Sequence, residues 1–155
     1  MDIFDIKILE VIQQEGRISN KELAKKVNLS PAPCWRRVHA LEEDGYIKSY
    51  TALLDHKKIG LTITAFAHVS LDDHHEKTVK SFDQAIANWP EVQECHATSG
   101  GYDYLLKITT VDMQDYNDFM YEKLLKLKAI RSVNTSFSMM QKKVSTELSL
   151  NHLQK

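Results

Sequence analysis

Start and stop signals for two short helices joined by a tight turn lie between residues 19 and 45. Ser19 and Glu22 have the spacing of a capping box, in which each side chain accepts from a free backbone N–H of the other residue. Ser30 followed by Pro31 marks a second start, because proline at the first helical position lacks only an N–H that would stay unpaired. Gly45 ends this second helix. Two capped helices with so short a connection predict a helix-turn-helix, whose second helix enters the DNA major groove.

The residues of the second helix sort onto two faces. Cys34, Val38 and Leu41 share one face at helical spacing and should be buried. Opposite them, Ala32, Arg36 and His39 should meet base edges, and Arg36 could fork onto the O6 and N7 of a guanine. The candidate DNA-binding residues are Lys21, Ser30, Ala32, Pro33, Trp35, Arg36, Arg37, His39, Lys48 and Tyr50. For Trp35 and Arg37, which lie on the flanks, contact with the DNA backbone and bracing of neighbouring helices both stay open; an ordinary solvated face is the alternative for the whole set.

The charge of the chain is close to neutral, with 20 basic and 21 acidic residues. Between Lys21 and Arg37, however, five basic residues face only Glu22. The positive charge is therefore local to the proposed DNA face, and phosphate neutralisation by one copy should give modest affinity. We expect several copies to act on one double-stranded DNA molecule.

The rest of the first domain is predicted to complete a winged helix-turn-helix over residues 1–55. Residues 2–15 are expected to form a helix capped by Asp2. Asn28 is expected to end the first of the paired helices in a left-handed conformation. Residues 46–53 are rich in aromatic and β-branched side chains and predict a short β-ribbon, or wing, with Lys48 or Tyr50 reaching a phosphate. Residues 56–61 are expected to be a polar linker.

The second half has the order strand, helix, strand, strand, helix, strand. The expected strands are 62–71, 92–98, 102–109 and 130–140, and the expected helices are 76–88 and 114–127. This repeat is the ferredoxin-like pattern, so the fold class is α+β, with a second domain over residues 62–150 and a tail over 151–155. Two helices should cover one face of the sheet. The other face, which bears apolar residues, should pair with a second copy.

Several motifs in order resemble the Lrp/AsnC (feast/famine) family of bacterial and archaeal transcription regulators over nearly the whole chain. The motifs are Ser30-Pro31-x-Pro33-Cys34 with Arg37, Leu41-Glu42-x-x-Gly45-Tyr46-Ile47, Tyr50-Thr51-Ala52-Leu53-Leu54, Gln93-Glu94-Cys95-His96, Ser99-Gly100-x-x-Asp103-Tyr104-Leu105-Leu106-Lys107, and Thr135-Ser136-Phe137. The resemblance of Ser136-Phe137-x-Met139 is to the branch whose members respond to leucine, methionine or cysteine.

The resemblance implies an amino-acid-responsive, sequence-specific DNA-binding protein of the cytoplasm. Its second domain is expected to bind the effector and to assemble the protein, as dimers through the sheets and then commonly as octamers. Effector pockets would lie between neighbouring second domains, beside the loop that joins the second and third strands. The implied effector residues are Ala97, Ser99, Gly100, Gly101, Tyr102, Asp103, Met113, Phe137, Ser138 and Met139.

The chemistry of these residues fits a free amino acid. Glycines let backbone N–H groups approach a carboxylate closely. Asp103 could accept from the ammonium group, and Met113, Phe137 and Met139 could enclose an apolar side chain. The alternative is that Gly100 and Gly101 form only a hairpin turn, with Asp103 part of its hydrogen bonding. Gly101 departs from the acidic or polar residue common at this place in the family, so the effector, leucine or methionine or a similar amino acid, stays open.

Other classes of function have little support in the sequence. No segment has the length of a membrane span, and the two cysteines, Cys34 and Cys95, are expected to be buried free thiols. No metal or cofactor is expected: the acidic and histidine run at 72–76 predicts a solvated loop in which Asp73 or a nearby acidic residue caps the following helix. An enzyme on a ferredoxin-like fold is the competing hypothesis, but no nucleophile–base or metal motif occurs.

Overall fold

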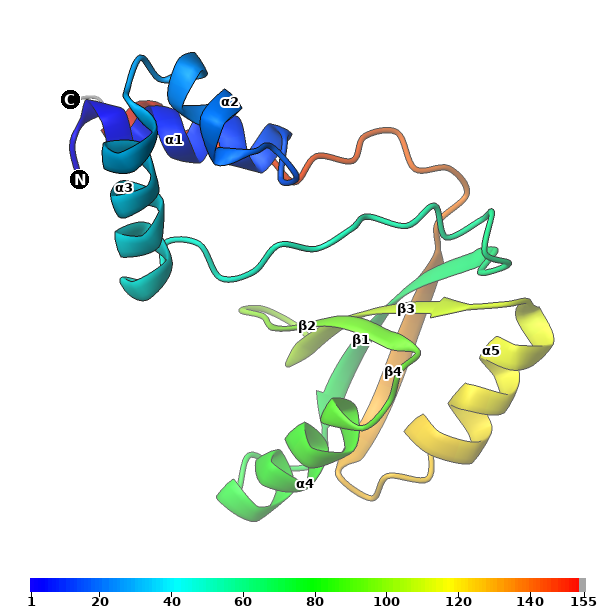
Figure 1. Cartoon of the computed structure of the whole chain (residues 1–155). Helices are drawn as coiled ribbons and strands as arrows, with labels where there is room; N and C mark the ends of the chain where they lie inside the picture. Colours follow the sequence, from blue (N-terminus) through cyan, green and yellow to red (C-terminus); the bar gives the residue numbers. More distant parts are fainter. Residues whose placement is uncertain (154–155) are drawn as a thin grey trace. The chain divides into compact units, whose positions relative to one another are not determined.

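The computed structural model of the protein describes residues 1–153 and divides the chain into two compact units (Figure 1). The helical unit contains Met1–Leu53 and also the segment that begins at Lys143, whereas the sheet unit contains Leu54–Lys142. The predicted boundaries placed residues 62–150 in one domain and only 151–155 in a tail. In the structure the segment from Lys143 groups with the helical unit, where the Gln13 side chain hydrogen-bonds to the backbone of Leu148, and the predicted boundary at residue 150 stays a prediction. Residues 154–155 of the predicted tail lie outside the described residues.

The helical unit contains the three predicted helices, α1 (Ile3–Gln14), α2 (Asn20–Lys26) and α3 (Pro31–Glu43). The capping box is confirmed: the Glu22 amide donates to the Ser19 hydroxyl and the Ser19 amide donates to the Glu22 carboxylate, each at 3.3 Å. Asn28 has the expected left-handed conformation, with φ of 58°. Ser30 is the N-cap of α3 by its backbone conformation, but its side chain makes no capping hydrogen bond.

One apolar cluster holds the three helices together. It combines Ile8 and Ile12 of α1 with Leu23 of α2 and with Cys34 and Leu41 of α3, all of them buried. This confirms the predicted inward face of α3, and burial raises the pKa of the Cys34 thiol. The helix predicted to read DNA is therefore fixed by side chains from both of its neighbours.

The predicted β-ribbon does not form, since no strand occurs between the end of α3 and Ile63 in the described chain. The Ile47 amide donates to the Leu41 carbonyl at 3.1 Å, which ties the start of this segment to α3. Beyond that point residues 49–53 follow an irregular path. A ribbon needs a second strand to satisfy its backbone groups, and the helical unit has none to offer.

The predicted linker at 56–61 is a compact turn at the start of the sheet unit. The Asp55 carboxylate accepts from the amides of Lys57 and Lys58, at 3.1 and 3.2 Å. The Leu61 amide donates to the His56 carbonyl at 2.8 Å and closes the turn. The chain thus enters the sheet unit through an ordered connection.

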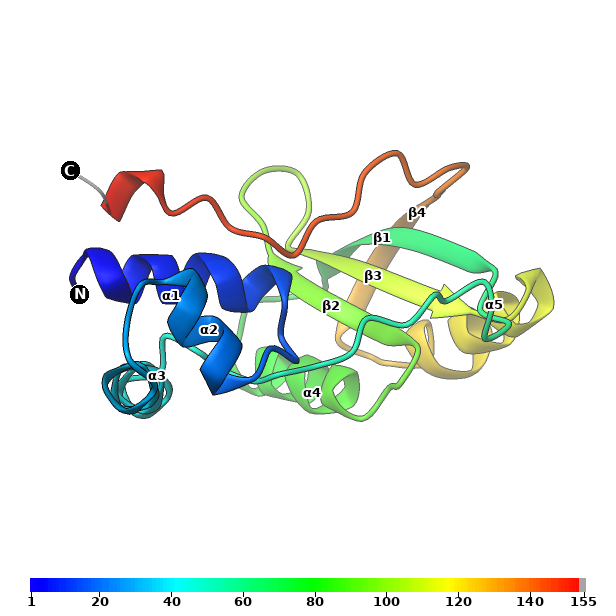
Figure 2. The ribbon, with the colours of Figure 1, turned by 45° about the horizontal axis from the view of Figure 1, so that its top comes forward.

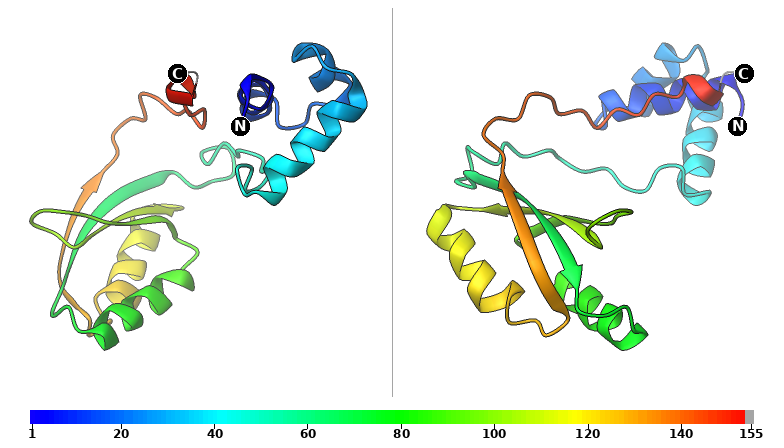
Figure 3. Two further views of the ribbon diagram at one scale, coloured as in Figure 1. Left: turned by 90° about the vertical axis from the view of Figure 1, so that its left-hand side faces the viewer. Right: turned by 180° about the vertical axis from the view of Figure 1, so that it is seen from behind.

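The sheet unit confirms the predicted strand and helix order, with four antiparallel strands in the order β2-β3-β1-β4. Its elements are β1 (Ile63–Leu71), α4 (Glu76–Ala87), β2 (Val92–Ala97), β3 (Tyr104–Thr110), α5 (Met113–Phe119), a π-helical continuation of α5 (Met120–Leu124) and β4 (Ile130–Phe137). The two helices lie on the same face of the sheet (Figure 3). Among residues 1–153, no helix has the length and apolar character of a membrane span.

Alternate side chains of the strands point to the two faces of the sheet. Toward the helices, Val69 of β1 and Leu106 of β3 pack with Phe82 of α4 in a fully buried core. The open face is mixed in character: Phe66 is 37% exposed, and nearby Lys107 forms an ion pair with Glu94 at 2.7 Å. The expectation of an apolar open face is therefore met only in part.

Cys95 corrects one prediction about burial. Cys34 is buried as expected, but Cys95 is exposed. Cys95 lies on β2, which is an edge strand of the sheet and is exposed along most of its length. An apolar context in the sequence does not bury a residue on such a strand.

Candidate DNA-binding and effector sites

The outward face of α3 has the composition predicted for base contact. Ala32, Arg36 and His39 are all exposed on this helix. Within residues 1–153, the Arg36 guanidinium is in none of the ion pairs, so its donors are available to a ligand outside the chain. Arginine presents donors in a rigid fork that matches the O6 and N7 acceptors of guanine.

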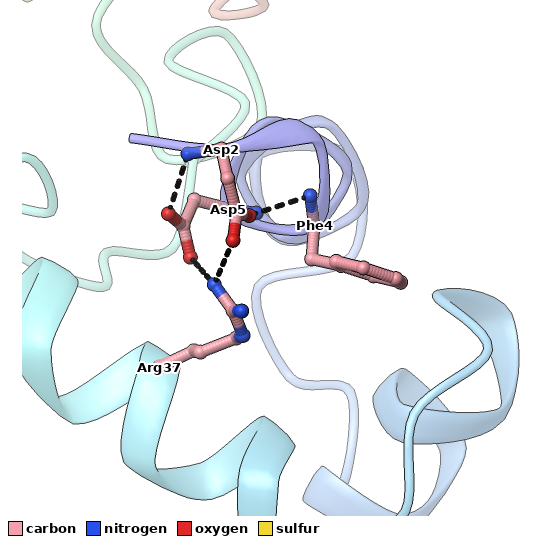
Figure 4. Close-up of polar contacts among 4 residues, drawn as sticks. All are labelled: Asp2, Phe4, Asp5 and Arg37. Carbon is pink, nitrogen blue, oxygen red and sulfur yellow. Dashed lines mark hydrogen bonds and ion pairs between the residues drawn. The ribbon is translucent and has the colours of Figure 1, made fainter.

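Arg37, the next residue, is bound within the protein instead. Its guanidinium lies 2.8 Å from the Asp2 carboxylate and 2.7 Å from the Asp5 carboxylate, both at the start of α1 (Figure 4). It also lies over the ring of Phe4, 5.5 Å from the centroid. The hydrogen bond that Arg37 donates to the Asp5 carboxylate, together with the bond to Asp2 and the charge of both carboxylates, raises the pKa of Arg37. Arg37 therefore braces α3 against α1, which was one of the two roles left open by the sequence.

Trp35 and His39 lie one turn apart on α3 and stack, with ring centroids 5.2 Å apart. Trp35 is 56% exposed, so its ring is available for contact with DNA even while stacked. His39 also approaches acidic side chains of the next turn, at 3.7 Å from Glu42 and 3.4 Å from Glu43. The predicted contact of His39 with a base edge would therefore compete with these acidic side chains.

Tyr50 is held against α3 in the helical unit. Its hydroxyl donates to the Glu42 carboxylate at 2.9 Å. Partial burial, followed by the hydrogen bond to Glu42 and its charge, raises the pKa of Tyr50 to about 12. The predicted phosphate contact would require this bond to open. Lys21 and Lys48 are exposed, as are Ser30 and, in part, Pro33.

The loop between β2 and β3 is an ordered hairpin. The Thr98 amide donates to the Asp103 carbonyl at 2.8 Å, and the Thr98 hydroxyl donates to the Tyr102 carbonyl at 2.9 Å. Gly100 has a φ of 120°, which side chains rarely allow, so glycine is needed there. Gly101 and Ser99 complete the exposed tip. Tyr102 packs on His68 of β1, with ring centroids 5.0 Å apart.

Asp103 anchors this hairpin to the end of β1. Its carboxylate accepts from the Leu71 amide at 2.7 Å and lies 2.7 Å from the Nε2 of His74. The hydrogen bond with His74, then that with the Leu71 amide, lowers the pKa of Asp103. The alternative in which Asp103 belongs to the hydrogen bonding of the turn is thus supported. The ammonium group of an effector would therefore bind an Asp103 carboxylate that already has the Leu71 amide and His74 as partners.

The other predicted effector residues gather around the end of β4. Phe137 packs edge-on against Tyr116 of α5, with centroids 4.9 Å apart, and the Tyr116 hydroxyl lies 2.7 Å from that of Thr135. Met113 begins α5 one turn before Tyr116 and is 45% exposed. The Ser138 amide donates to the Thr64 carbonyl at 2.8 Å, which continues the pairing of β4 with β1. Met139 is 96% exposed.

The strand register separates these two groups of residues. Tyr104, directly after the hairpin, pairs with Val69 near the end of β1, whereas Phe137 pairs with Ala65 near its start. The hairpin and the Phe137 group therefore lie at opposite ends of one sheet. This separation within one copy is compatible with the predicted pockets between neighbouring second domains, which remain a prediction.

Two residues that contact the predicted effector residues were not predicted from the sequence. His74 bonds to Asp103, and Tyr116 supports Phe137, yet neither lies in a motif that pointed to these contacts. The run at 72–76 behaves as expected in part: Asp73 accepts from the His75 amide at 2.8 Å next to the start of α4. In the part of the chain that the structure describes, no cluster of side chains could hold a metal ion.

Family models match both units. A winged helix-turn-helix DNA-binding model matches residues 1–48, and a Lrp/AsnC ligand binding domain model matches residues 64–148. The first match covers α1 to α3, and the second covers the sheet of the second unit except for its first residue, Ile63.

Individual proteins resemble the chain over nearly its full length. It is 40% identical to the proline dehydrogenase transcriptional activator of Rhizobium radiobacter, over 91% of this chain and 90% of that protein. It is 39% identical to the leucine-responsive regulatory protein of Escherichia coli, over 96% and 90%. The crystal structure of a transcriptional regulator of Neisseria meningitidis in complex with L-methionine has a TM-score of 0.95, with 38% identity and 99% of each chain covered.

Proposed function

Because this chain belongs to the Lrp/AsnC family and is a transcription regulator with a helix-turn-helix and a ligand-binding domain, we propose how its residues divide the work. Arg36 reads a base edge in the major groove, with Ala32 and His39 beside it. Arg37 sets the angle of α3 and does not read DNA. The observation that carries this division is the contrast between the two neighbouring guanidinium groups, one available and one bound to two carboxylates.

The DNA contacts are tested by binding to the promoter region of the protein's own gene. Arg36→Ala should weaken binding to the preferred sequence by about 1–3 kcal/mol and relax the preference at one base position. Arg17→Ala is the matched control, since Arg17 is also exposed in the helical unit but lies outside α3. If Arg36→Ala keeps both affinity and sequence preference while remaining folded, the groove assignment is incorrect.

The effector site that we propose is shared between copies. One copy supplies the hairpin from Ser99 to Asp103, with Ala97 before it, and a neighbour supplies Met113, Phe137, Ser138 and Met139. The strand register supports this arrangement, because it places the two groups at opposite ends of one sheet. The exposed methionines suit an apolar amino acid. Since a close structural neighbour was solved with L-methionine, methionine is the first candidate and leucine the second.

A shared site makes binding depend on assembly. Calorimetry against the proteinogenic amino acids, combined with light scattering, should find an effector that binds the assembled protein and changes its size distribution. Asp103→Asn should weaken this binding, whereas Asp72→Asn, an exposed neighbour at the end of β1, should not. Full affinity in a monomeric preparation would contradict a shared site.

The assembly itself is proposed as homodimers through the open sheet faces, which then combine into a higher oligomer such as an octamer. A cytoplasmic protein of this kind would bring several α3 helices to one DNA molecule. Such multivalency raises overall affinity without a new contact in each copy, which answers the modest local charge of each α3. Light scattering of the full chain tests the size.

A further inference from the structure

The segment after the sheet returns to the helical unit and lies along α1. We call residues 143–153 the C-terminal strap. It runs beside α1 in views from different directions and ends with a short 3-10 turn at Asn151–Leu153 (Figures 2 and 3). The strap therefore belongs to the same unit as the helix-turn-helix, although the whole sheet unit separates the two parts in sequence.

Gln13 holds the strap by its backbone. The Gln13 side-chain N–H donates to the Leu148 carbonyl at 2.9 Å, and the Leu148 amide donates to the Gln13 side-chain oxygen at 2.8 Å. One amide side chain thus pairs with both backbone groups of one residue, as a neighbouring strand would. Gln14 adds a longer contact, 3.3 Å from the Glu147 carboxylate. This pair of hydrogen bonds recognises the extended backbone at Leu148 and not the Leu148 side chain, which is 73% exposed.

Burial on α1 supports the same contact independently. Ile6 is only 3% exposed, yet it is absent from the apolar cluster of the three helices. It lies two helical turns before Gln13 and so on the same side of α1, whereas Ile8 of the cluster points to nearly the opposite side. The strap runs along the side of α1 that carries Gln13, and Leu150 of the strap is half-buried. Ile6, on the side of α1 that carries Gln13, is thus buried outside the apolar cluster of the three helices.

The strap begins close after the residues at the end of β4. It begins five residues after Ser138, which pairs with Thr64 at the edge of the sheet beside Phe137. These are the residues that the proposed function places in the effector site. The chain therefore connects the two units twice, once after Leu53 and once after Lys142. The second connection joins the proposed effector residues to α1, and Arg37 joins α1 to α3 through Asp2 and Asp5.

We propose that the C-terminal strap, fastened by Gln13, transmits the effector-dependent change at the end of β4 to the DNA-binding helices. This inference rests on the proposed amino-acid response. A change in the position of residues 137–139 displaces the strap or detaches it from α1. The resulting movement of α1 then changes the position of α3. Coupling of this kind requires a contact that differs between the two states, and the Gln13–Leu148 pair is that contact.

The first test is the protection of the Leu148 amide from hydrogen exchange in the full chain without any amino acid. Gln13→Ala removes both bonds and should speed exchange of this amide by about tenfold. Lys7→Ala, an exposed change on the same helix, is the control and should leave the rate unaltered. Equal exchange rates in the wild type and in Gln13→Ala would overturn the docking of the strap.

The second test is the change in DNA affinity on adding the amino acid to which the wild type responds. Gln13→Ala should keep the affinity without amino acid within about twofold, but lose most of the change. Leu148→Pro removes the same amide donor without altering α1 and should have the same effect, which covers the case of a poorly folded Gln13→Ala. A full response in both variants would overturn transmission through the strap. If the wild type responds to no amino acid, the proposed effector function fails and transmission fails with it, while the exchange test still decides whether the strap docks.

Discussion

The two units of this protein place their candidate sites in different ways. In the helical unit, α3 presents Arg36 and its neighbours within one copy, and Arg37 fixes that helix against α1. In the sheet unit, the predicted effector residues lie at opposite ends of one sheet. A site built on one helix can be identified from periodicity and caps, whereas a site shared between copies depends on an assembly that local patterns do not encode.

The largest expected effect is a loss of stability in the sheet unit alone. Phe82 is fully buried in the sheet unit and packs on Tyr104, with ring centroids 4.5 Å apart. Phe82→Ala should destabilise this unit by about 3–5 kcal/mol, because it removes contacts and leaves a cavity. Each unit has one tryptophan, Trp35 or Trp89, so urea unfolding followed in Trp35→Phe and Trp89→Phe backgrounds reports them separately. An equal loss in both signals would show that the units unfold together.

A smaller effect is expected from a helix cap. Ser19→Ala removes the capping box of α2 and should cost the helical unit about 1 kcal/mol, read from the Trp35 signal. Ser30→Ala is the matched control, since Ser30 occupies the same position on α3 without a side-chain bond and should change stability little. A similar loss in both variants would mean that the serine effect is not one of capping.

The stability of the sheet unit should depend on Asp103 in acid, because Asp103 anchors the hairpin between β2 and β3. The pKa of Asp103 is lowered in the folded protein by His74 and the Leu71 amide. Asp103 therefore contributes stability above the ordinary aspartate range of about 4, and this contribution is lost as the pH falls through its lowered pKa. Asp103→Asn should flatten the acid dependence of the Trp89 signal, while the Trp35 signal keeps its own. An unchanged Trp89 profile would contradict the anchoring role of Asp103.

The smallest effect should appear in alkali and in the helical unit. The pKa of Tyr50 is raised to about 12, so its neutral form is favoured in the folded state. This contribution is fully present below the ordinary tyrosine pKa of about 10 and is lost as the pH rises through the folded value. Ultraviolet titration of Tyr50→Phe should lack one tyrosine that titrates near pH 12 in the wild type, and the Trp35 signal should lose part of its alkaline destabilisation. Identical titration curves would contradict the bond to Glu42.

Much of the fold was predictable because its signals are local. The capping box at Ser19, the left-handed Asn28 and the alternation along β1 each follow from neighbouring residues. The predicted β-ribbon at residues 46–53 does not form, because this segment has the composition of a strand but no partner strand to pair with. The role of the segment after Lys142 was missed because the Gln13–Leu148 contact joins residues far apart in sequence and leaves no periodic pattern.

For the sites, local reasoning identified the α3 face but could not choose between the roles of Arg37. Its carboxylate partners lie on α1, so only the packing of α1 on α3 decides the question. The hairpin tip was identified from its glycines, and Gly100 has the conformation that requires one. The partner of Asp103, His74, belongs to a run that looked like a solvated loop, and nothing in its spacing pointed to the hairpin.

The discontinuity of the helical unit affects the order in which the protein can fold during synthesis. The three helices leave the ribosome first, and domains generally fold in that order. The strap that hydrogen-bonds to Gln13 follows only after the entire sheet unit has been made. Until then the helix-turn-helix has its own apolar core but lacks the two hydrogen bonds between Gln13 and Leu148. Completion of the DNA-binding unit is therefore timed by synthesis of the ligand-binding domain that precedes the strap in sequence.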